Sequence, residues 1–102
     1  MPQMHSVSSN NTAVVRTNEG RDVYLHGTKV VSHNALENTV TLNSGGWTTA
    51  TTKSRMNQYS NEFLTIGARN GYRVFQKNFD WFVQQPNGEI VDFYDGITIK
   101  LE

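Results

Sequence analysis

One helical pattern lies in the middle of this chain, between two groups of short β-type segments. Four apolar side chains share one face of the expected helix: Met56, Tyr59, Phe63 and Ile66. At about 100° per residue they fall within an arc of roughly 80°, which is typical of a helix that packs on one side. Threonines precede the pattern as candidate N-caps, and Gly67 is placed to end it. The sequence therefore predicts one central amphipathic helix over about 51–66.

The segments on either side of this helix alternate apolar and polar residues, as antiparallel strands do. The expected strands are 13–17, 21–26, 28–33 and 38–42 before the helix, and 72–77, 79–85, 89–94 and 97–101 after it. Asn87-Gly88 and Asp95-Gly96 stand between apolar runs and are strong hairpin signals. We therefore expect an α+β domain with an N-terminal antiparallel β-meander, the helix, and a C-terminal antiparallel β-meander.

Composition indicates one domain preceded by a tail. Residues 1–11 are rich in Ser, Asn and Gln with few large apolar side chains, which is typical of disorder, so a single domain is expected over 12–102. The chain has no cysteine, which excludes a disulfide framework and a thiolate metal site. It also lacks an apolar run of the roughly 20 residues that span a bilayer, and a secretory signal. A cytoplasmic protein without a membrane anchor is expected.

The charges cancel overall but not locally. Nine basic and nine acidic residues argue against an acidic DNA mimic and against a protein that coats nucleic acid nonspecifically. Residues 53–77 nevertheless carry five basic side chains and one acid, whereas 78–102 carry five acids and one base. Either two oppositely charged surfaces result, or the charges neutralise each other across neighbouring strands.

The junction between the first meander and the helix concentrates hydroxyl groups and cations. Glycines there allow close backbone approach, and the first N–H groups of a helix attract anions. The candidate ligand-binding residues are Gly45, Gly46, Trp47, Thr49, Thr51, Thr52, Lys53 and Arg55. The spacing of a G-x-x-x-x-G-K-[ST] phosphate loop is missing, and Lys53 and Arg55 would point about 160° apart on a regular helix. A purely structural junction, with a glycine turn and a threonine cap, is the alternative.

A second hypothesis places single-stranded nucleic acid on the aromatic C-terminal meander. Exposed aromatic rings beside cations are typical of such binders. The residues for this alternative are Arg69, Tyr72, Arg73, Phe75 and Lys77. No RNA-recognition signature accompanies them.

Enzymatic signals are weak. A phosphodiester-acting enzyme would use His26 or His33 as a general base, but no spacing supports that role over surface histidines. The serines form no G-x-S-x-G elbow, and only Glu37 lies near the two histidines as a third metal ligand. We expect neither catalysis, nor a metal, nor a cofactor.

The segment Gly46-Trp47-Thr48-Thr49-Ala50-Thr51-Thr52-Lys53-Ser54-Arg55-Met56-Asn57 resembles a pattern, G-W-x-T-x-T-T-K-x-R-x-N, in short bacteriophage-encoded proteins. The likeness covers most of the chain from Thr12 onward. It implies a viral setting and carries no catalytic residues over.

Small phage proteins outside the capsid and the replication machinery commonly bind a host component or a defence factor. The resemblance therefore implies a non-enzymatic accessory protein of the host cytoplasm that binds a host or defence-related component. The residues of the 45–55 junction add a phosphate-bearing small molecule as a candidate partner. Single-stranded nucleic acid is the alternative partner, and a homodimer through an edge strand stays open.

Overall fold

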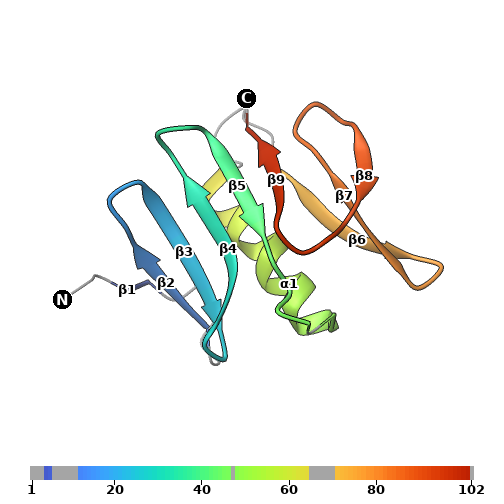
Figure 1. The fold of residues 1–102 in the computed structure, drawn as a ribbon, viewed down its shortest axis with the longest axis horizontal. Helices are drawn as coiled ribbons and strands as arrows, with labels where there is room; N and C mark the ends of the chain where they lie inside the picture. The colour runs from blue at the N-terminus through green and yellow to red at the C-terminus, as the bar shows by residue number, and fades with distance from the viewer. Residues whose placement is uncertain (1–3, 6–11, 47, 65–70, 102) are drawn as a thin grey trace.

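The computed structural model describes residues 4–5, 12–46, 48–64 and 71–101. The predicted tail at 1–11 lies outside the described residues except for Met4–His5, which form a short strand, β1, paired with β2. The other described residues form two antiparallel sheets, a helix and the turns between them (Figure 1). The predicted α+β class is confirmed.

The larger sheet has six strands in the order β1-β2-β3-β4-β5-β9. After β1, its strands are β2 (Thr12–Arg16), β3 (Gly20–Leu25), β4 (Thr28–Asn34), β5 (Thr39–Leu42) and β9 (Ile97–Lys100). One row of directly opposed, buried side chains crosses five strands: Val14, Val23, Val31, Leu42 and Ile97. This apolar row gives the sheet its core face.

The smaller sheet contains β6 (Arg73–Lys77), β7 (Asp80–Gln84) and β8 (Ile90–Asp92). The turn predicted at Asn87-Gly88 is confirmed, since β7 and β8 pair across it. The hairpin predicted at Asp95-Gly96 is wrong, because β9 leaves this meander and pairs with β5.

β9 pairs with β5 because this position buries its apolar side chains. Its side chains Ile97 and Ile99 extend the core face of the larger sheet. Asp95 is held beside the end of β5, also in the larger sheet, where its Oδ1 accepts hydrogen bonds from the backbone N–H and the hydroxyl of Ser44 at 2.8 and 2.7 Å. The chain therefore crosses between the sheets at this point instead of turning back on β8.

The helix α1 (Ala50–Tyr59) begins at Thr49, whose Oγ1 accepts a hydrogen bond from the Thr52 N–H at 3.2 Å. It continues as a π-helical turn, η1 (Ser60–Leu64). The predicted helix is thus confirmed over 51–64, while its last two residues and the stop at Gly67 lie outside the described residues. Leu64 falls off the apolar stripe of a regular helix, but the wider i→i+5 turn brings it to the core.

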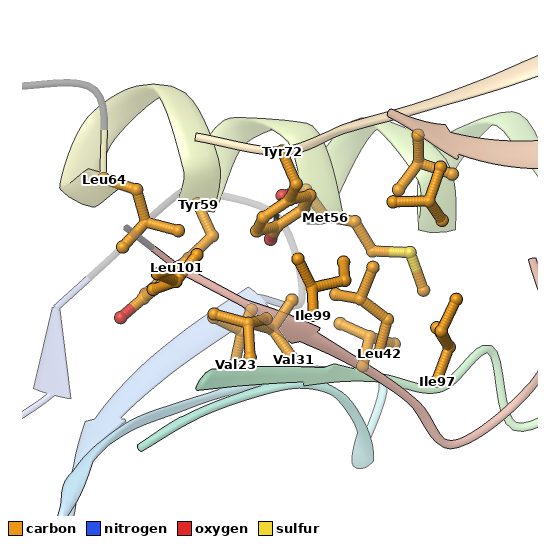
Figure 2. Packing of buried hydrophobic residues seen from close by; sticks show 14 of the residues in the cluster. Val23, Val31, Leu42, Met56, Tyr59, Leu64, Tyr72, Ile97, Ile99 and Leu101 are labelled. Atoms are coloured by element: carbon orange, nitrogen blue, oxygen red, sulfur yellow. Dashed lines mark hydrogen bonds between the residues drawn. The ribbon is translucent and has the colours of Figure 1, made fainter. Parts of the chain in front are cut away.

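The helix lies across the core face of the larger sheet, behind β4 and β5 in Figure 1, and also contacts β6. Figure 2 shows Met56 and Tyr59 reaching from the helix toward the sheet, with Tyr72 beside them. Side-chain hydrogen bonds fix β6 and its approach to the helix. Asn57 accepts from the N–H of Val74 and donates to its carbonyl, and the Tyr72 hydroxyl donates to the Met56 carbonyl. Both sheets therefore share one hydrophobic core around the helix.

Candidate functional site

The β5–α1 junction is held by local hydrogen bonds. Gly45 N–H donates to Asn43 Oδ1 at 2.8 Å, and Gly46 N–H donates to Ser44 Oγ at 3.2 Å. Gly45 has a φ of 62°, and a Cβ there would stand 2.5 Å from Cγ2 of Thr28. Only glycine fits both the backbone conformation and this approach. Trp47 lies outside the described residues.

A pocket of about 450 Å³ opens between this junction, the β3–β4 turn and the N-terminus of α1. Its described lining residues are Leu25, His26, Thr28, Val30, Ser44, Thr49, Thr51 and Thr52. The three threonines expected at a ligand site from the sequence line this pocket together. Its volume lies in the range of small-molecule sites, roughly 300–1,000 Å³.

The pocket has an apolar side and a polar side. Leu25 and Val30 are buried and form an apolar wall. Hydroxyl groups and an exposed imidazole, His26, supply polar contacts, and the described lining residues include no carboxylate. The helix N-terminus adds partial positive charge. This combination suits a ligand with an apolar body and one anionic group.

The two cations predicted for the site are placed elsewhere. The ammonium group of Lys53 lies 5.8 Å from the centre of the Trp81 ring, a cation–π distance. Arg55 donates from Nε to Thr12 Oγ1 at 2.9 Å and from Nη1 to Gln58 Oε1 at 3.1 Å. Neither side chain lines the pocket. Their divergence follows from their two-residue spacing on the helix.

The residues of the nucleic-acid alternative are divided between the two faces of β6. Tyr72 is 3% exposed, its hydroxyl is bonded to Met56, and burial raises its pKa well above the usual value. Tyr72 therefore cannot stack on a base. Arg73, Phe75 and Lys77 alternate along β6 on its outer face, and Phe75 stacks on Phe82 with ring centres 5.7 Å apart. Arg69 lies outside the described residues.

That outer face also carries acids. Lys77 is directly opposite Asp80, and Phe82 is directly opposite Asp92. Two carboxylates thus accompany the two cations of β6, and the local charges balance. The segregation along the sequence is neutralised here across neighbouring strands.

A polar cluster that the sequence analysis missed lies at the end of the core. His33 Nδ1 is 2.6 Å from the hydroxyl of Tyr59, which also receives a hydrogen bond from Arg21. Burial and, secondarily, Arg21 lower the pKa of His33. The alternation of Val31 and His33 on one strand could have revealed this inward position. The described part of the chain contains no group of three or more side chains suited to a metal ion.

Fold and pocket together define a small single-domain α+β protein with a ligand-sized pocket beside a helix N-terminus. Within the described residues, no helix is both long and apolar enough to cross a membrane. Residues 2–100 match the family described as Kyanoviridae Gp96 protein. Because the match spans nearly the whole chain, this protein belongs to that family and is encoded by a bacteriophage, as the resemblance implied. No curated protein and no solved structure matches the chain.

Proposed function

We propose that this phage protein is a non-enzymatic accessory protein of the host cytoplasm that binds a phosphate-bearing small molecule. The observation that carries the proposal is the pocket of about 450 Å³ beside the N-terminus of α1. Sequestering such a molecule, or sensing it, would act on a host or defence pathway without turnover.

The contacts available in the pocket support a phosphate rather than a cation. Phosphate oxygens accept hydrogen bonds from hydroxyl groups and from helical N–H groups near the start of a helix. Thr51 is exposed at this end of α1 and lines the pocket, while Thr52 is buried and shares its hydroxyl contact with Thr49 at 3.1 Å. We assign Thr51 as the principal side-chain donor. The wall of Leu25 and Val30 would hold a ring of the ligand.

Single-stranded nucleic acid on the outer face of β6 is the second candidate, favoured by the Phe75–Phe82 stack between Arg73 and Lys77. The charge balance of that face argues against it, because nucleic-acid binding draws most of its affinity from uncompensated cations. Steep salt dependence of oligonucleotide binding would favour this candidate over the pocket.

A thermal-shift panel tests the proposal with inorganic phosphate, nucleoside monophosphates, cyclic nucleotides and short oligonucleotides. We expect at least one mononucleotide to stabilise the protein by about 2.7 kcal/mol at a hundred times its Kd. Thr51→Val keeps the side-chain shape but removes the hydroxyl, and should weaken that ligand about tenfold.

Matched controls separate the pocket from the rest of the junction. Thr48→Val makes the same chemical change at an exposed residue that does not line the pocket, and should leave binding intact. Lys53→Ala and Arg55→Ala should also retain binding, since both side chains are engaged elsewhere. Binding that survives Thr51→Val but is lost in Lys53→Ala would refute this assignment, and a panel without any stabilising small molecule would refute the function.

A further inference from the structure

Strand β8 is an open edge of the smaller sheet. At the two ends of its ladder with β7, the Glu89 carbonyl accepts from the Gln85 N–H at 2.8 Å and the Phe93 N–H donates to the Trp81 carbonyl at 3.0 Å. Midway between these two bonded pairs, Val91 lies opposite Val83. In an antiparallel ladder the residues between such bonded pairs point their N–H and C=O groups to the other side. Ile90 and Asp92 therefore present unused backbone donors and acceptors along the outer edge of β8. Figure 1 shows β8 at the end of its sheet, beyond β7.

The opposite edge of the same sheet is covered in part by α1. On β6, the outward N–H and C=O groups of Val74 are both bonded to the side-chain amide of Asn57, at 2.7 and 2.8 Å. That amide takes the place of a neighbouring strand. Among the described residues, no side chain is bonded to the outward backbone groups of β8 in this way. The two edges of one small sheet thus differ, because α1 occupies the β6 edge at Val74 while the outward groups of β8 have no such partner among the described residues.

The side chains along β8 specify what such a strand must carry. Four large hydrophobic residues of the described chain are exposed, and two of them, Ile90 at 55% and Tyr94 at 61%, flank Asp92 at alternate positions. Val91 and Phe93, the intervening residues, turn inward against the core. The exposed side chains along β8 and the two residues after it are therefore apolar, acidic and apolar in turn.

We propose that β8 binds an extended segment of a partner protein by strand addition, and that this segment carries an apolar, a basic and an apolar residue at alternate positions. Directly opposed side chains on neighbouring strands contact one another, so the two apolar residues would cover Ile90 and Tyr94. The basic residue would pair with Asp92. This surface is separate from the pocket at α1 and does not depend on its ligand.

A second copy of this chain fits the edge less well. Antiparallel pairing of two β8 strands about Val91 would make the two Asp92 carboxylates diagonal neighbours, about 7–8 Å apart. The segment 78–102 has five acids and a single base, so no cation of β8 would separate them. The charge of the edge therefore favours a basic partner over self-association.

The test uses isotope-labelled full-length protein and an acetylated, amidated threonine nonapeptide with valine, lysine and valine at its third, fifth and seventh positions. Saturable shifts of the Ile90 and Asp92 amide resonances are expected. Replacing the lysine by glutamate, or methylating its backbone nitrogen, should abolish these shifts, because the first reverses the charge and the second removes a ladder bond. Shifts at Thr51 are not expected, which separates this result from any failure of the pocket proposal.

Protein variants make the assignment specific. Asp92→Lys should weaken the lysine peptide about tenfold and strengthen the glutamate peptide. Ile90→Pro removes one outward N–H without touching the β7 ladder and should also weaken binding. Asp80→Lys reverses an exposed charge on the same face but away from the edge, and should change affinity less than twofold.

Three results would overturn the proposal. The first is the absence of saturable shifts at millimolar peptide. The second is equal affinity for the lysine and glutamate peptides. The third is a homodimer of the native protein that Ile90→Pro dissociates, because the edge would then belong to a second copy.

Discussion

At the scale of single residues, some positions in this chain can be occupied only by glycine, because a neighbouring atom leaves no room for a side chain. Gly20 lies within β3, and a Cβ at that position would collide with the carbonyl of His33 on β4. Thr17 accepts a hydrogen bond from the Gly20 N–H at 3.0 Å and closes the preceding turn. The strands expected at 13–17 and 21–26 leave this glycine outside the sheet, because spacing alone does not reveal how closely the next strand approaches.

The burial of His33 should make the stability of the fold depend on pH. In the folded state, burial and the positive charge of Arg21 lower the pKa of His33 from its usual value of 6.5. Below pH 6.5 the unfolded chain therefore binds more protons than the folded chain. Stability contributed by neutral His33 is present above about pH 6.5 and is lost as pH falls toward the lowered pKa. Urea unfolding from pH 7.5 to 5 measures this loss.

His33→Asn is the matched control for this prediction. Asparagine places an oxygen near the position of Nδ1, so it can accept from Tyr59 without titrating. The variant should lose less stability than the native protein over the same pH interval. Parallel curves for the two proteins would show that His33 is not responsible.

At the scale of elements, the sequence predicted most of the strands, the helix start and the Asn87-Gly88 turn, since these follow from local patterns. The end of the helix was harder to predict, because the π turn at Ser60–Leu64 responds to packing. The destination of β9 was missed for a similar reason. A dipeptide such as Asp95-Gly96 reports a turn but not which strand pairs beyond it.

Asn57 tests how strongly α1 is joined to β6. Asn57→Ala leaves the N–H and the C=O of Val74 without their partner, which should lower the free energy of unfolding by about 2 kcal/mol. Ser54→Ala, at an exposed position of the same helix, should change it by less than about 0.5 kcal/mol. Urea denaturation of the two variants gives both values. Equal effects would mean that the amide contributes nothing to docking.

At the scale of the whole molecule, the candidate site was predicted in part. The threonine hydroxyls at the start of α1 could be inferred from sequence and line the pocket. The opposite wall, formed by Leu25, His26 and Val30, could not, because it comes from a turn that only the folded sheet brings to the helix. The two cationic side chains expected at this site, Lys53 and Arg55, do not line the pocket, because Lys53 lies over Trp81 and Arg55 is bonded to Thr12.

Because β9 pairs with β5 at the end of the larger sheet, substitutions on the two faces of β9 should differ strongly in their effect on stability. Ile99 is fully buried, whereas Thr98 is exposed and shares a hydroxyl contact with Thr41 at 3.1 Å. Ile99→Ala should cost about 2–5 kcal/mol, and Thr98→Ala less than about 1 kcal/mol. Calorimetry or urea denaturation of the two variants measures both losses of stability. Similar losses at the two positions would contradict the pairing of β9 with β5.

The same crossing affects how the protein folds on the ribosome. Thr41 and Thr98 are 57 residues apart in sequence yet lie side by side. On the ribosome, the edge of β5 that pairs with β9 stays unpaired until the segment containing β9 has left the exit tunnel. Closure of such a long loop before its contacts form slows folding. We therefore expect the nascent chain to expose the unpaired edge of β5 to host chaperones until β9 joins the sheet.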